Sequence, residues 1–380
     1  MSMSVRPEIL IWARERSHLD PAKLLRRFPA LHEWEQGVKQ PTLKQLEDFA
    51  KTTHIPFGYL FLTEPPEEQL PVPDFRTVGN AEIEQVSPDL LDTLYQCQAR
   101  QEWYRDYAIL HHEAPVSFVN TLTVGSNIEE AAAEMRETLA FSVEDRGSTW
   151  SDALRKLVEE AEQNGVLVMN NGIVGTNTHR KLDPKEFRGF ALSDDHAPLI
   201  FVNGADTKAA QIFTLTHELV HIWINKSALS DADMTSAPDD EIERWCNLVA
   251  AEFLVPASAI DDHRLDHDHV TDELENLARR FKVSTLVILR RLRDTNHCSQ
   301  AQYNEYFSAE QGRILALMAE RSSSGGNFYN TQLIRFGKRF TRALIDDTLE
   351  GRTLYRDAFQ MLGLKKVSTF NALAEKLEVI

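Results

Sequence analysis

Residues 217–221 read His-Glu-Leu-Val-His, and this short pattern constrains the fold more than any other feature of the chain. The pattern lies in an apolar stretch with helical periodicity, residues 207–224. Side chains four residues apart lie on one face of a helix, so His217 and His221 can bind one metal ion. Glu218 can orient a water molecule on that metal and take its proton. The pattern therefore predicts a zinc site that hydrolyses amide bonds.

A catalytic zinc ion also needs a third protein ligand and one open position. Glu243 is the best candidate, because it lies in the next expected helix, residues 239–254, on the same face as Asn247. Asn247 either orients a ligand by a hydrogen bond or simply packs. Acids at a helix start are favoured by the macrodipole alone, and three of them remain as alternatives to Glu243: Asp239, Asp240 and Glu241.

Short apolar segments before the motif helix predict a small sheet of three strands, at residues 165–169, 187–192 and 198–202. We expect the last of them, within 197–203, to be an edge strand beside which an extended substrate can bind. Asp206 is the expected N-cap of the motif helix, and a polar loop is expected at 227–237. The remaining chain shows mostly helical patterns, so the sequence predicts a mainly helical α+β fold.

Three further polar residues precede the motif helix and are candidates for lining the cleft: Arg188, His179 and His196. A cation or imidazole there could stabilise the oxyanion of a tetrahedral intermediate or bind substrate. The sequence does not choose between the three, and a structural role is the alternative for each.

Composition limits the setting in which such a site would work. The longest apolar runs are far shorter than the roughly 20 residues that cross a bilayer, so we expect no membrane association. The three cysteines form no CxxC pair, and we interpret them as reduced thiols of a cytoplasmic protein. A formal net charge of −17 argues against a surface devoted to nucleic acid.

The chain is long enough for two or three domains. Residues 1–64 have the pattern of a compact helical unit, and the proline-rich, charged stretch 65–80 is expected to be a linker. The metal site then falls in a domain spanning 81–260. A helical C-terminal region, 261–380, contains a helix-turn-helix-like segment at 271–294, whose apolar positions we expect to be core.

Two motifs together resemble the ImmA/IrrE family of zinc metallopeptidases: the His-Glu-Leu-Val-His pattern, and the run from Glu243 to Pro256 that reads ERWCNLVAAEFLVP. The family typically has alanine and phenylalanine where this chain has Cys246 and Val249. The resemblance implies a zincin-like sheet packed on the motif helix. It also implies a gluzincin-like Zn²⁺ site with His217, His221 and Glu243 as ligands and Glu218 as base. The expected substrate is a partner protein, typically a repressor, cleaved in a stress, mobile-element or defence response.

The N-terminal unit resembles an XRE-type helix-turn-helix, chiefly in the stretches 34–37 and 40–46. The chain between Leu24 and Trp34 is several residues short of the usual turn plus recognition helix, and Pro29 falls where that helix should run. Reading a DNA groove requires three or four side chains from such a helix. We therefore expect this unit to dock protein or to serve structure rather than to bind DNA.

An alternative function belongs to a different class. The N-terminal unit and the Gly-Gly-Asn-Phe-Tyr stretch at 325–329 also resemble proteins encoded beside PIN-like nuclease toxins. In that setting the chain would be an antitoxin that binds its toxin partner, with proteolysis secondary or absent. Its acidic charge would suit a basic, RNA-cleaving partner.

Overall fold

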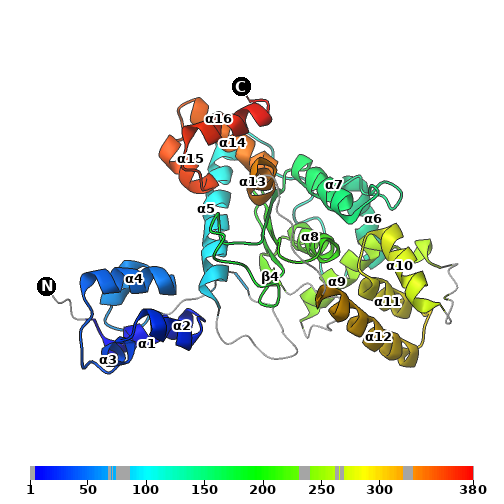
Figure 1. Ribbon diagram of the computed structural model, residues 1–380. Helices are drawn as coiled ribbons and strands as arrows, with labels where there is room; N and C mark the ends of the chain where they lie inside the picture. Colours follow the sequence, from blue (N-terminus) through cyan, green and yellow to red (C-terminus); the bar gives the residue numbers. More distant parts are fainter. Residues whose placement is uncertain are drawn as a thin grey trace. The chain divides into compact units, whose positions relative to one another are not determined.

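The computed structural model describes residues 5–66, 70, 72–73, 86–230, 240–261, 265, 269–319 and 328–379 (Figure 1). It divides into two compact units. The first comprises Met1–Pro71 with Ile83–Leu94, and the second comprises Val72–Glu82 with Tyr95–Ile380. Among the described helices, none combines the length and apolar character needed to cross a membrane.

The first unit is a small helical bundle. It contains α1 (Pro7–Arg16), α2 (Pro21–Arg27), α3 (Leu31–Glu35), α4 (Leu43–Thr53) and the 3-10 helix η1 (Phe57–Phe61). Trp34, Phe28 and Phe49 pack edge to face or tilted in its core, and a capping box from Thr42 starts α4. Helix α3 has only five residues, too few for a groove-reading helix. The stretch 31–35 therefore does not supply a recognition helix of the usual length.

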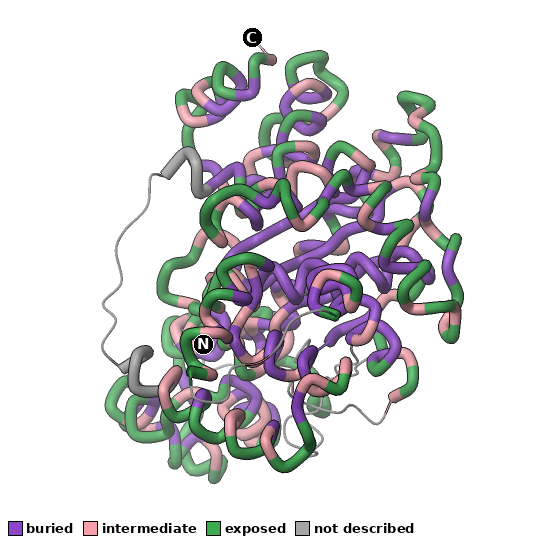
Figure 2. The backbone as a smooth tube through the Cα atoms, turned by 90° about the vertical axis from the view of Figure 1, so that its right-hand side faces the viewer, coloured by how far each residue is buried: buried purple, intermediate pink, exposed green. Residues whose placement is uncertain are grey.

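The second unit contains a four-stranded mixed sheet in the order β1-β3-β2-β4. Its strands are β1 (Leu167–Asn171), β2 (Gly189–Leu192), β3 (Leu199–Asn203) and β4 (Ala228–Ser230). β3 pairs in parallel with β1, while β2 pairs antiparallel with both β3 and β4. All residues of these strands are buried (Figure 2). The prediction of an α+β fold, mainly helical with a small sheet, is confirmed.

Two expectations about this sheet are wrong. β3 lies between β1 and β2, so the stretch 197–203 is an inner strand and offers no free edge to a substrate. The expected polar loop at 227–237 begins with β4 instead, because the edge of β2 is free to pair with it. The N-cap of the motif helix is also one residue later than expected: the Thr207 hydroxyl, not Asp206, accepts the Ala210 amide.

Helices cover the sheet and form the core of the unit. They are α5 (Pro88–Leu110, which contributes to both units), α6 (Ile128–Thr138), α7 (Trp150–Gln163), α8 (Lys208–Trp223) and α9 (Glu241–Leu254). α8 packs on β2 and β3, and α9 packs between α8 and α6. The small, buried Ala250 and Ala251 let α9 approach closely. The motif helix is consequently enclosed on several sides.

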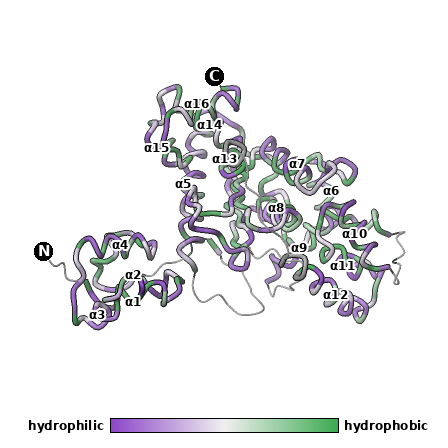
Figure 3. Tube along the Cα trace, viewed as in Figure 1, coloured by the Kyte–Doolittle hydropathy of each residue, from purple (hydrophilic) through white to green (hydrophobic). Residues whose placement is uncertain are grey.

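The C-terminal part of the chain is helical, as expected. It contains η2 (Ala257–Ala259), α10 (Val270–Phe281), α11 (Thr285–Asp294), α12 (Gln300–Ala319), α13 (Phe328–Phe336), α14 (Lys338–Leu349), α15 (Tyr355–Leu362) and α16 (Val367–Lys376). α10 and α11 both contain hydrophobic and hydrophilic residues (Figure 3). Their apolar residues, among them Leu277, Phe281 and Leu289, join the same core as α8 and α9.

Candidate metal centre

Helices α8 and α9 bring three potential ligands to one buried point. His217 and His221 lie one turn apart on α8, and their Nε2 atoms are 3.1 Å apart. The Glu243 carboxylate, from the first turn of α9, lies 3.1 Å from His217 Nε2 and 3.0 Å from His221 Nε2. All three side chains are buried. Among the described residues, these three form the cluster with the spacing of a metal site.

The geometry of this cluster fits a zinc ion. Bonds of about 2.0–2.1 Å in a tetrahedral site place neighbouring ligand atoms about 3.3 Å apart, close to the separations observed here. Two imidazoles and one carboxylate are also the donor set of catalytic zinc sites that keep a fourth position open. If these side chains had only a packing role, three buried polar groups would not be expected to meet at one point, because burying polar groups is costly. The residues present can therefore hold the metal.

Glu218 lies beside the cluster and is fully buried. Within the described part of the chain, neither of its carboxylate oxygens makes a hydrogen bond of normal geometry, but the Ser230 hydroxyl lies close enough to oppose the rise of its pKa. Burial and the nearby Glu243 carboxylate raise the pKa of Glu218 well above its usual value. A buried carboxyl without a hydrogen bond of normal geometry is costly unless it serves function, so its place is that of a group handling water or substrate.

Electrostatics favour an ionised third ligand. Burial acts to raise the pKa of Glu243, but the charges and hydrogen bonds of His217 and His221 together hold it below its usual range. Burial lowers the pKa of His221, although Glu243 opposes that change. A carboxylate and a neutral imidazole are the protonation states that bind metal.

The start of α9 is built to hold Glu243 in place. Asp240 is the N-cap, and its Oδ1 accepts the amides of Ile242 and Glu243 at 2.8 and 3.1 Å. Asp240 thus caps the helix, and Glu241 is exposed, so neither competes for the cluster. Asp239 lies outside the described residues. The Ser230 hydroxyl of β4 donates to Glu243 Oε1 at 3.3 Å.

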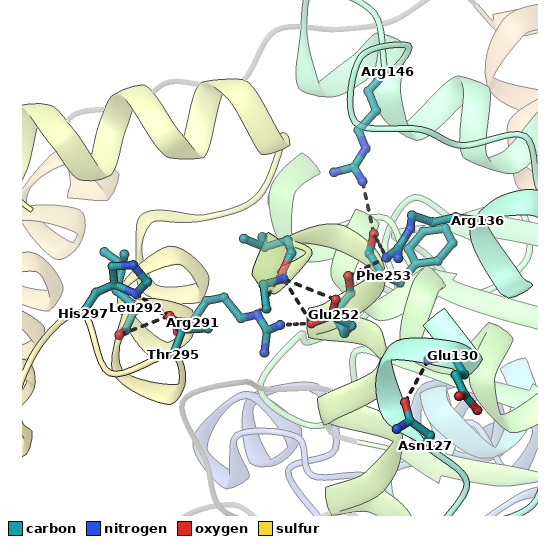
Figure 4. A network of polar contacts seen from close by, with 12 residues as sticks. Asn127, Glu130, Arg136, Arg146, Glu252, Phe253, Arg291, Leu292, Thr295 and His297 are labelled. Atoms are coloured by element: carbon teal, nitrogen blue, oxygen red, sulfur yellow. Dashed lines mark hydrogen bonds and ion pairs between the residues drawn. The ribbon is translucent and has the colours of Figure 1, made fainter. Parts of the chain in front are cut away.

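The other end of α9 is held by arginines (Figure 4). Arg146 donates to the carbonyls of Phe253 and Leu254, at 3.2 and 2.6 Å, and to that of Phe281 at 2.8 Å. Arg291 of α11 pairs with Glu252. Cations at a helix C-terminus satisfy its free carbonyls and complement its dipole. Both ends of the ligand-bearing helix are therefore fixed.

The remaining predicted residues do not join the cluster in the described structure. Asn247 is buried, but its Oδ1 has no partner among the described residues. Arg188 lies 3.9 Å from Asp206, at the start of α8. His179 is exposed in a turn, and the His196 amide is bound by Asp194. Roles for Asn247, Arg188, His179 and His196 therefore remain predictions.

Sequence reasoning missed two residues at the site. Gly189 of β2 pairs with Ser230 of β4, and a Cβ atom at Gly189 would lie 2.5 Å from the Thr214 side chain and 3.3 Å from Glu218 Oε1. Only glycine lets α8 approach the sheet this closely. Ser230 falls in a stretch of polar composition, which gave no signal that its hydroxyl reaches Glu243.

Comparison with known proteins agrees with this geometry. Residues 161–293 match a peptidase M78 model described as an IrrE N-terminal-like domain, and residues 336–376 match a domain of unknown function, DUF8813. The chain is 32% identical over 132 residues to the radiation response metalloprotease IrrE of Deinococcus deserti. That alignment covers 30% of this chain and 45% of the relative, so the chain spans less than half of that protein's length. Residues 161–293, which contain both α8 and α9, are therefore similar to the IrrE-like peptidases, as the two sequence motifs predicted.

Proposed function

We propose that this chain is a zinc-dependent endopeptidase. One observation carries the proposal: His217, His221 and Glu243 converge within about 3 Å of one another, beside the fully buried carboxyl of Glu218. The family match is to a metallopeptidase, and two imidazoles with a glutamate are a known donor set of catalytic zinc in metallopeptidases. Neither match favours the alternative of a toxin-neutralising binding protein.

Each residue has a defined part in the proposed reaction. His217, His221 and Glu243 hold the zinc, which when bound supplies the Lewis acidity that polarises a scissile carbonyl and acidifies water. Glu218 takes the proton of the attacking water and returns it to the leaving amine. The caps at the two ends of α9 keep Glu243 in position, as precise ligand placement requires.

We further propose that the substrate is a regulatory protein, such as a repressor, cleaved with narrow specificity in a stress response. The relative's name, which refers to a radiation response, supports this role. The three cysteines are free thiols, which suits the reducing cytoplasm. The first unit would then dock a protein partner, in keeping with its short α3.

Metal content tests the site directly. Purified wild-type protein should contain about one zinc per chain, and His217→Ala and Glu243→Ala should lose it. Glu241→Ala is the matched control, because it removes an exposed acid from the same turn of α9 and should keep the metal. Absence of zinc from the reconstituted wild type would end the proposal.

Glu218→Gln separates metal binding from catalysis. This variant should keep zinc but lose activity by about 10²–10⁴-fold, because it cannot move the proton. Mapping new protein N-termini in cells that express wild type or Glu218→Gln would reveal substrates as cleavages found only with the wild type. Equal cleavage in both would refute the assigned role of Glu218.

A further inference from the structure

The strand β4 has one side free of the sheet. It pairs with β2 through Ala228, Leu229 and Ser230, and in an antiparallel pair alternate residues direct their hydrogen bonds toward the neighbouring strand. The Leu229 amide points the other way, because its acceptor belongs to a different segment. The outer edge of this short strand therefore presents the backbone of Leu229.

That acceptor comes from the proline-rich stretch before α5. The Leu229 amide donates to the Pro73 carbonyl at 3.0 Å, and the neighbouring Val72 side chain is only 7% exposed. We call Val72–Pro73 the strap. Proline has no N–H to return to Leu229, and the chain bends at Val72. Among the described residues, the strap thus meets this edge through the hydrogen bond between Leu229 and Pro73, and its Val72 is buried.

This edge lies next to the metal cluster. Ser230 follows Leu229 directly, and its hydroxyl donates to Glu243 Oε1 at 3.3 Å. Consecutive residues of a strand are about 3.3 Å apart, so a peptide paired with Leu229 lies one residue away from Ser230, whose hydroxyl contacts the expected ligand Glu243. An extended peptide gains affinity by adding a strand to such an edge.

The opposite edge of the sheet is closed. α13 packs on β1, and Gly337 lies so close to Val168 that an added Cβ would be 2.7 Å from the Val168 carbonyl oxygen. Another chain has no room to pair there. Of the two edges of the described sheet, β4 is the one that a peptide can use.

We propose that the outer edge of β4 is a docking surface for an extended peptide segment, and that the strap occupies it in the resting chain. The occupant supplies a backbone carbonyl to the Leu229 amide and places an apolar, β-branched side chain where Val72 is buried. A substrate segment of this kind must displace the strap. The proposal rests on the proposed function for what happens to the peptide, but docking itself requires no catalysis.

A labelled peptide tests the proposal. The probe is a fluorescein-labelled copy of residues 68–75, Glu-Gln-Leu-Pro-Val-Pro-Asp-Phe, and the full chain carries Glu218→Gln to prevent turnover. Val72→Asp should release the strap, because a carboxylate cannot be buried unpaired. If the strap is docked nine-tenths of the time, its release tightens peptide binding about tenfold in fluorescence polarisation. Val72→Ala should act in the same direction but more weakly.

Pro65→Asp is the matched control, since it adds the same charge at an exposed position of the same stretch and should leave peptide affinity unchanged. Hydrogen exchange gives a second measurement: the Leu229 amide should exchange faster in Val72→Asp, and added peptide should slow it again. Equal peptide affinity in wild type and Val72→Asp, or no binding to either, would overturn the proposal. A chain without zinc that still binds the peptide would refute the peptidase but uphold the docking surface.

Discussion

The buried ion pair between Glu252 of α9 and Arg291 of α11 makes a quantitative test of how the ligand-bearing helix is held (Figure 4). Both side chains are buried. Arg291 Nε also donates to the Val255 carbonyl at 2.8 Å, and Glu252 also accepts the Ala257 amide at 3.2 Å. Glu252 is the carboxylate in direct contact with the guanidinium, while the charges of Asp294, Glu129 and Arg136 also act on Arg291.

Removing one partner leaves the other charge buried without its ion-pair partner. Arg291→Met keeps most of the side-chain volume but leaves the Glu252 carboxylate buried, which should cost about 3–5 kcal/mol. Glu252→Gln leaves the guanidinium unpaired and should cost a similar amount. The double variant buries no charge and loses chiefly the hydrogen bond to Val255, so it should cost about 1–2 kcal/mol. The coupling energy should therefore exceed about 2 kcal/mol.

Native-state hydrogen exchange of the zinc-loaded chain measures the opening free energy of α9 itself. Arg279→Met serves as the control, because Arg279 pairs with Glu275 on the surface, with its side chain 57% exposed. That change should cost less than about 1 kcal/mol. A double variant that loses as much stability as the two single variants together would refute the reasoning, since it would show that the charges do not neutralise each other.

Two further changes test a buried carboxyl on α7 and the close packing of α8 on β2. Burial raises the pKa of Glu162 to about 7, so the folded chain binds more protons than the unfolded chain above about pH 5 and loses stability as the pH rises toward 8. The glutamine of Glu162→Gln can still accept the Arg339 amide. In urea unfolding at several pH values, this variant should lack on the order of 3 kcal/mol of the decrease in the free energy of unfolding. An unchanged pH profile would contradict this. Gly189→Ala would place its Cβ 2.5 Å from Thr214, which should cost about 1–3 kcal/mol in urea unfolding and weaken zinc binding. Gly312→Ala, in open space on α12, should stabilise by about 0.5–1 kcal/mol, and equal effects would show that close packing at Gly189 is unimportant.

The two helices of the site were predictable because their signals are local. The apolar periodicity of residues 207–224 and the spacing of His217 and His221 fix a helix and one of its faces. Strands β1, β2 and β3 were predictable for a similar reason, since each is an apolar run that ends at turn residues. These features need no knowledge of distant parts of the chain.

The order of the strands, and which acidic residue of α9 reaches the metal cluster, depend on contacts that the sequence does not show. β3 is an inner strand because β1 and β2 both pair with it, and an apolar run is the same whether one neighbour is present or two. Asp240 and Glu243 are both acids at a helix start, and only the backbone path distinguishes them. Asp240 has the extended conformation of a cap, while Glu243 lies one turn in and faces α8.

The roles of the basic residues in the helix-turn-helix-like pattern of α10 and α11 also depend on contacts that the sequence does not show. A basic, amphipathic helix pair can serve nucleic acid or a protein core, and its sequence is compatible with both. The structure separates the two uses by partner: Arg291 is buried against Glu252, and Arg293 lies over the Tyr303 ring beside Asp294. These two arginines of α11 are thus occupied by groups of the chain itself, whereas Arg279 and Arg280 of α10 are exposed.

β4 is the element on which the site and its regulation both depend, and it is the one with the weakest sequence signal. Three residues are too few to show an alternating pattern, and they stand at the start of a polar stretch. They form a strand because the free edge of β2 satisfies their backbone groups. Once β4 is paired, the direction of each residue follows: the Ser230 side chain faces Glu243, and the Leu229 amide faces the strap. A change in strap occupancy therefore acts one residue away from Ser230, whose hydroxyl contacts the expected ligand Glu243.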